Sequence, residues 1–216
     1  MKRVFGHLGT VRLVFLLAMA LLVPLAHAST LGDGNSVPPS PLFPGGALLS
    51  STSGTIATPT FTDSYTENVY SDPGNTWCAG CLDFVYQFTN NGPDSNERYT
   101  MSNFAGFLVD VGTNPFGGHD PTTIDRSLNG AVIGFNFSAS DEISPGLTTP
   151  FLVIETNAQS FTDGFVSAQA GTAGSGFGFA PLSPVVTPAP SSLALLGGGL
   201  SLAGALLGKS LIGKLR

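Results

Sequence analysis

The sequence predicts an all-β fold: an antiparallel, jelly-roll-like β-sandwich flanked by an N-terminal signal peptide and a C-terminal transmembrane helix. Short runs in which apolar and polar residues alternate indicate half-buried strands. Clusters of Gly, Pro and Asn between these runs indicate turns. The middle of the chain has no sustained apolar stripe with the 3.6-residue period of a helix. Many short strands separated by turns are typical of a sandwich.

Residues 1–28 have the three parts of a signal peptide. Lys2 and Arg3 form a basic start, and the stretch from Val11 to Leu25 is apolar. Residues 26–28 read Ala-His-Ala, which matches an A-x-A cleavage site. We therefore expect signal peptidase to cut after Ala28 and the remaining chain to be exported.

Residues 191–216 are predicted to be a C-terminal anchor with a basic tail. The 18 residues from Ser191 to Gly208 carry no charge. As a helix they would span about 27 Å, close to the hydrocarbon thickness of a bilayer. The segment is apolar all round, which argues against a surface helix of a soluble domain. The tail contains Lys209, Lys214 and Arg216, and by the positive-inside rule this leaves the body of the protein outside.

Pro188, Ala189, Pro190 and Ser191, followed by the glycine-rich apolar segment and the basic tail, resemble the PEP-CTERM sorting signal. Ala189 stands where that family usually has an acidic residue. The stretches CLDFVYQFTN and FLVIETNAQSFTDGF also look like the body of some PEP-CTERM proteins. The resemblance implies processing by an exosortase-like enzyme in a Gram-negative bacterium that makes extracellular polysaccharide. It implies passage through the inner membrane to the cell surface or beyond, and it names no reaction.

Between the two ends we expect a flexible leader (29–45), a sandwich domain (46–180) and a Pro-rich stalk (181–190). The leader is rich in Pro, Gly and Ser and has little clustered apolar surface. The segment from Thr172 to Pro190 ends in PLSPVVTPAP and is also predicted to be mobile.

Within the domain, the alternation of apolar and polar residues places individual strands. Gly106 predicts a bend or bulge in the longest of them, and Asn129-Gly130 is the best hairpin signal in the chain. The predicted strands are Leu82–Thr89, Arg98–Val111, Ala131–Ser138 and, as a central strand, Phe151–Thr156.

The charge balance excludes one class of partner. Between Ser29 and Thr187 there are two basic and 14 acidic residues, a formal charge of −12. Phosphate backbones would repel such a domain, so we expect no nucleic-acid partner.

Cys78 and Cys81 form the only cysteine pair, spaced as C-x-x-C. A structural zinc needs four ligands, and His119 is the only histidine after the signal peptide. A thioredoxin-like motif would stand at the start of a helix, whereas this pair opens a predicted strand. We expect a local disulfide.

No catalytic residue and no cofactor are predicted. His119 has no marked partner, and no nucleophile elbow or metalloprotease motif is present. If the domain binds a metal, the candidates are Asp110, Asp120 and Asp125, because calcium takes oxygen ligands from such loops. Glu155 stands where its pKa would rise on burial, although its simpler role is the first polar residue after a core strand.

Three functions remain open. The first is a non-enzymatic surface or matrix protein associated with exopolysaccharide. The second is a carbohydrate-binding module that uses exposed aromatics such as Tyr65, Tyr70 or Trp77. The third is a secreted hydrolase, which would need two carboxylates within about 10 Å in a cleft.

Overall fold

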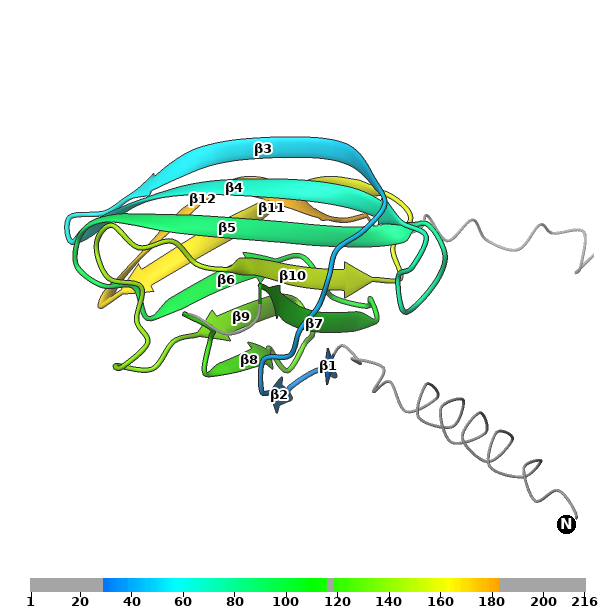
Figure 1. Cartoon of the computed structure of the whole chain (residues 1–216), viewed down its shortest axis with the longest axis horizontal. Helices are drawn as coiled ribbons and strands as arrows, with labels where there is room; N and C mark the ends of the chain where they lie inside the picture. Colours follow the sequence, from blue (N-terminus) through cyan, green and yellow to red (C-terminus); the bar gives the residue numbers. More distant parts are fainter. Residues whose placement is uncertain (1–28, 116–118, 183–216) are drawn as a thin grey trace, which may run out of the picture. The chain divides into compact units, whose positions relative to one another are not determined.

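The structure, a computed structural model, describes residues 29–115 and 119–182. In this part of the chain two six-stranded antiparallel sheets pack face to face (Figure 1), which confirms the predicted all-β sandwich. The predicted signal peptide, sorting motif and anchor lie outside the described residues. Across the residues that are described, no helix is long and apolar enough to cross a membrane.

The first sheet, sheet A, contains the longest strands. Its hydrogen-bonded order is β1 (Ser29–Thr30), β7 (Val109–Asn114), β10 (Phe151–Thr156), β5 (Cys81–Pro93), β4 (Phe61–Asp72) and β3 (Ala47–Ala57).

The second sheet, sheet B, covers one face of sheet A. Its order is β12 (Thr172–Pro181), β11 (Phe161–Ala170), β6 (Arg98–Ser102), β9 (Val132–Asn136), β8 (Thr123–Arg126) and β2 (Ser36–Val37).

Aromatic side chains fill the space between the sheets. On β5, Phe84, Tyr86 and Phe88 alternate with outward-facing residues and are fully buried. Phe88 stacks on Tyr99 of β6 with ring centroids 4.2 Å apart, which joins the two layers at the centre. Offset aromatic pairs of this kind contribute beyond the area that they bury.

Three of the predicted strands are confirmed. Those over Leu82–Thr89 and Ala131–Ser138 correspond to β5 and β9, and Phe151–Thr156 is β10, a strand with a neighbour on each side. The predicted Asn129-Gly130 hairpin is also confirmed, since it joins the antiparallel pair β8 and β9, and Gly130 adopts a φ of 70°.

The prediction of one bent strand over Arg98–Val111 is wrong. The chain forms β6 in sheet B, turns, and continues as β7 in sheet A. Asn103 and Gly106, both at positive φ, make the turn that carries the chain between the sheets. Apolar residues continue on both sides of the turn, because each sheet has an inner face to bury. The sequence pattern therefore did not reveal that the chain passes from one sheet to the other.

The leader belongs to the fold. Residues 29–45 supply β1 to sheet A and β2 to sheet B, and Leu31 and Leu42 are buried. This segment has few apolar residues, but Leu31 and Leu42 pack in core clusters made by strands distant in sequence. Similarly, the predicted mobile segment begins as an ordered strand, because β12 pairs with β11 along its whole length.

Candidate functional site

Six of the 14 acidic residues are buried, although charged side chains are rarely buried without a partner. Two of them, Asp63 and Glu67, face the core from β4. The other four lie on sheet A near the end where β5 begins and β10 ends. These four are Asp72, Asp83, Asp110 and Glu155.

The strand register brings the second group together. Glu155 of β10 stands directly opposite Asp83 of β5 on one side and Asp110 of β7 on the other. Directly opposite residues project from the same face of a sheet. On β5 and β10 the next residues on this face are Val85 and Val153, which lie in a small cluster apart from the main core. The carboxylates therefore occupy the outer face of sheet A.

We call Asp72, Asp83 and Glu155 the acidic triad. Each offers one oxygen, and these oxygens all lie within 4.8 Å of one another. The residues are 6 %, 0 % and 3 % exposed, respectively. Three carboxylates at this separation repel one another strongly unless protons or a cation neutralise them.

The loop between β4 and β5 closes over the triad and donates one hydrogen bond to each member. The Gly74 amide donates to Asp72 Oδ1 (2.7 Å), and the Thr76 amide donates to Glu155 Oε2 (3.1 Å). The Asn75 side chain donates to Asp83 Oδ1 (2.8 Å). Figure 1 shows this loop at the end of sheet A where β10 finishes. All three donors are neutral, so only protons or a cation can balance the negative charge of the triad.

Burial raises the pKa of Asp83 to about 8. The hydrogen bond from Asn75 opposes this rise, and the neighbouring Glu155 and Asp72 add to it. Burial also raises the pKa of Glu155 against the hydrogen bonds from Thr76, with a further contribution from Asp110 and Asp72. The expected effect of burial on Glu155 is therefore present, and its cause includes neighbours that the sequence did not reveal.

The triad is poorly arranged for hydrolysis. A glycosidase needs two carboxyl groups that a sugar can reach from a cleft, whereas these side chains are almost fully covered. Closely spaced carboxylate oxygens are, however, the ligands that hard divalent cations prefer.

The two core-facing acids are separate from the triad. Both oxygens of Asp63 accept from the Asn96 amide (2.7 and 2.8 Å), and burial raises the pKa of Asp63 to about 6. Glu67 Oε2 accepts from the Phe179 amide (2.8 Å). Burial raises the pKa of Glu67 to about 8.

The described residues include two basic side chains, and neither is hydrogen bonded or ion paired to the triad in the contacts observed. Arg98 pairs with Asp125 at 2.5 Å, and its hydrogen bonds to that carboxylate are the largest cause of the lowered pKa of Asp125. Arg126 is buried, pairs with Asp33 (3.0 Å), and donates to four backbone carbonyls, those of Leu31, Phe104, Phe107 and Gly130.

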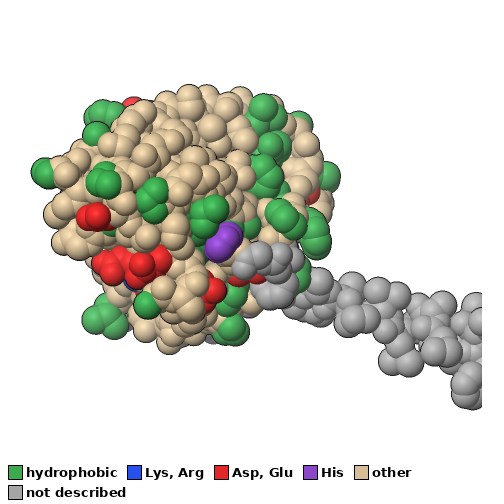
Figure 2. Space-filling view, turned by 60° about the vertical axis from the view of Figure 1, so that its left-hand side comes forward, with side chains coloured by type: hydrophobic (Ala, Val, Ile, Leu, Met, Phe, Trp, Pro, Cys, Tyr) green, Lys and Arg blue, Asp and Glu red, His purple; other side chains and the backbone are tan. Residues whose placement is uncertain are grey.

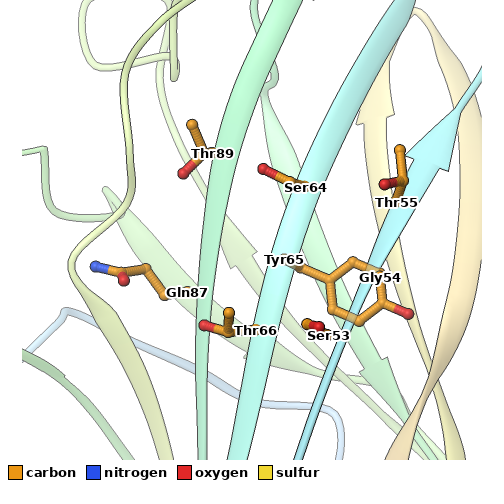
Figure 3. Close-up of a pocket in the computed structure, with 8 residues that line it drawn as sticks. All are labelled: Ser53, Gly54, Thr55, Ser64, Tyr65, Thr66, Gln87 and Thr89. Atoms are coloured by element: carbon orange, nitrogen blue, oxygen red, sulfur yellow. The ribbon is translucent and has the colours of Figure 1, made fainter.

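The outer face of β3, β4 and β5 presents a second feature, a set of short polar side chains (Figure 3). The register aligns them in two rows that cross the three strands. We call these rows the hydroxyl shelf: Thr55, Ser64 and Thr89 in one row, and Ser53, Thr66 and Gln87 in the other. Spacings in such a grid are set by the sheet, about 4.8 Å between strands and about 7 Å along them.

The aromatics proposed for sugar stacking do not form an exposed row. Tyr65 is 6 % exposed, and its hydroxyl donates to the Phe177 carbonyl (2.6 Å). Tyr70 and Trp77 are half-buried. Phe165 and Phe177 are instead exposed beside each other, with ring centroids 5.5 Å apart. The face in Figure 2 shows dispersed apolar side chains and a local group of acidic ones.

Cys78 and Cys81 form a disulfide in the loop that covers the triad. The calcium candidates are not gathered in one place. Asp110 lies beside Glu155, Asp120 accepts from Thr113 (2.7 Å), and Asp125 is held by Arg98 on sheet B.

His119 is exposed in the β7–β8 connection. Asp72 and Asp83 were not predicted as candidate ligands from the sequence. The turn at Ser71–Asn75 was the available signal, because it places the end of β4 beside the start of β5.

We find no match for this chain among protein-family models, curated proteins or solved structures.

Proposed function

We propose that this chain is an exported, non-enzymatic surface or matrix protein: a jelly-roll-like β-sandwich displayed on a stalk and associated with exopolysaccharide. One observation carries the proposal. A signal-peptide pattern, an acidic domain, a Pro-rich segment, an uncharged apolar segment and a basic tail follow one another along the sequence. The resemblance to PEP-CTERM sorting signals implies that the protein passes from the inner membrane to the cell surface.

The position of the acidic side chains supports a non-enzymatic role. The carboxylates that lie closest together are buried, and His119 is exposed in a loop without a neighbouring nucleophile among its observed contacts. Catalysis by a general acid or base needs the group within hydrogen-bond reach of the substrate. The buried triad does not meet that requirement.

The hydroxyl shelf supports contact with a polysaccharide. Its side chains both donate and accept hydrogen bonds, as do sugar hydroxyls, and the shelf is uncharged along its two rows. Two of its side chains also form hydrogen bonds within the domain. The Thr89 hydroxyl bonds to the Thr148 hydroxyl (2.8 Å), and the Gln87 side chain donates to the Thr149 carbonyl (3.2 Å). Such a surface suits weak, repeated contacts along a polymer rather than one deep binding pocket.

The export route is tested by cell fractionation. The full chain is compared with a version that stops before Pro188. We expect the full chain to appear first in the membrane fraction and later at the surface or in the medium, and the truncated chain never to enter the membrane fraction. If both versions fractionate alike, the sorting function of the tail is wrong.

The polysaccharide contact is tested by retention on extracellular polysaccharide from the producing cells. Replacing Ser53, Thr66 and Gln87 with Ala removes one row of the shelf and is expected to reduce retention several-fold. A matched control removes three exposed hydroxyls that lie outside the shelf, at Thr123, Ser160 and Thr162. Equal retention of both variants would show that the shelf is not the contact surface.

A further inference from the structure

We propose that Asp72, Asp83 and Glu155 form a calcium-binding site on the outer face of sheet A, closed by the β4–β5 loop. Asp110 stands beside the site as a fourth carboxylate. The inference is independent of the export route and concerns a ligand that the sequence placed elsewhere, at Asp110, Asp120 and Asp125.

The first argument is an oxygen atom without a partner. Asp83 is 0 % exposed, and its Oδ1 accepts from Asn75. No hydrogen-bond donor reaches its Oδ2, and the neighbouring Asp72 side chain is itself a carboxylate. Asp83 also belongs to the triad, whose ligand oxygens lie within 4.8 Å of one another. A buried carboxylate oxygen without a partner costs free energy that a cation at this position would recover.

The second argument comes from Asp110, which lies outside the triad. It is 1 % exposed, and its Oδ1 also lacks a hydrogen-bond partner. It stands directly opposite Glu155 across β7 and β10. A second orphaned carboxylate oxygen on the same face therefore lies next to the same site.

The third argument is the charge. The two basic side chains among the described residues have other partners, Arg98 with Asp125 and Arg126 with Asp33. The groups that do reach the triad are neutral amides of the loop. A divalent cation would balance half of the charge of four ionised carboxylates without further protein groups.

The donor set favours calcium over magnesium. Calcium takes six to eight oxygen ligands at about 2.3–2.6 Å in a flexible geometry, whereas magnesium demands near-ideal octahedral geometry and is usually held by one or two carboxylates and several waters. The triad offers three almost fully buried carboxylates whose oxygens lie within 4.8 Å of one another. Water and loop carbonyls would complete the six to eight ligands.

The test uses the full chain, purified with a chelator and then transferred to chelator-free buffer. Trp77, the only tryptophan, lies two residues after Asn75 and donates its amide to the Asn75 side chain (2.9 Å). Its emission reports binding directly, and it can sensitise the luminescence of bound Tb³⁺, a calcium substitute. We expect one Tb³⁺ per chain, displaced by calcium at sub-millimolar to millimolar concentration. At saturating calcium the melting temperature should rise by about 5–10 °C.

Asp83→Asn and Glu155→Gln keep the shape of the side chains and remove charge. We expect both variants to lose the calcium-dependent rise in melting temperature and to lower the affinity for Tb³⁺ at least tenfold. Without calcium they should melt at or above the wild-type temperature, because repulsion within the triad is reduced. Asp163→Asn, at an exposed site on β11, is the matched control and should bind calcium like the wild type.

Three results would overturn the assignment. One is a wild-type melting temperature that is the same in calcium and in chelator. Another is Tb³⁺ binding that survives unchanged in both triad variants, which would place the ion elsewhere. The last is an equal response to magnesium and calcium, which would show that the site does not select the larger ion.

Discussion

Glu67 lies in the core between the two sheets, and its burial predicts that the stability of the domain falls as the pH rises. Its pKa is about 8 in the folded protein and 4.5 ordinarily. Between these values the folded state holds a proton that the unfolded state has released. By linkage, this group lowers the free energy of unfolding by about 1.4 kcal/mol per pH unit from pH 4.5 to 8. The whole effect is at most about 5 kcal/mol, complete above pH 8 and absent below pH 4.5.

Glu67→Gln isolates this effect, because the amide is uncharged and nearly isosteric. We expect the variant to match the wild type within about 1–2 kcal/mol at pH 5 and to exceed its stability by about 3–5 kcal/mol at pH 9. The assay is urea unfolding followed by circular dichroism at five pH values, in the presence of a chelator so that cations do not contribute.

The pH dependence of wild-type stability cannot by itself be assigned to Glu67, because Asp63 and Asp83 also have raised pKa values. The difference between Glu67→Gln and the wild type removes these shared contributions. Asp163→Asn, at an exposed position, should stay within about 0.5 kcal/mol of the wild type throughout. Parallel pH profiles for Glu67→Gln and the wild type would refute the reasoning.

Other substitutions test the packing. Arg126→Met should cost about 3–5 kcal/mol in urea unfolding, because four carbonyls lose their donor; a loss under 1 kcal/mol would contradict this. Gly54→Val should lower the melting temperature by several degrees, since a Cβ at Gly54 would lie 2.4 Å from the Tyr65 hydroxyl, and Tyr65→Phe in the same chain should recover part of the loss. Reducing the Cys78–Cys81 disulfide should cost no more than about 2 kcal/mol in calorimetry because the loop is short; a larger loss would show that the disulfide holds more than its own loop.

The fold was largely predictable because its strands carry local signals. In β5, Phe84, Tyr86 and Phe88 alternate with outward-facing residues, and Asn129-Gly130 identifies its own hairpin. The turn from sheet B to sheet A after β6 was not predictable in the same way. The same alternation continues on both sides of it, and the choice of sheet is made by distant partners.

The acidic triad could not be predicted from the sequence for a related reason. Asp72, Asp83 and Glu155 come from three strands and share no spacing that identifies a ligand loop. The strand register alone brings them together. Asp110, Asp120 and Asp125 were proposed because they are near one another in sequence, but Asp125 belongs to the other sheet and pairs with Arg98.

The leader shows that composition alone does not predict whether a segment is ordered. Residues 29–45 have the Pro, Gly and Ser content of a flexible segment, yet Leu31 and Leu42 are 1 % and 7 % exposed. Two well-placed apolar side chains and short pairings with β7 and β8 order the segment.

The central claim is that the chain is exported and then processed at both ends. The most direct measurement is the intact mass of the native protein recovered from the surface or medium of the cells that make it. We predict a chain that begins at Ser29 and lacks the apolar segment from Ser191 onward. A mass that retains residues 1–28 or the complete C-terminal segment would contradict the corresponding part of the account.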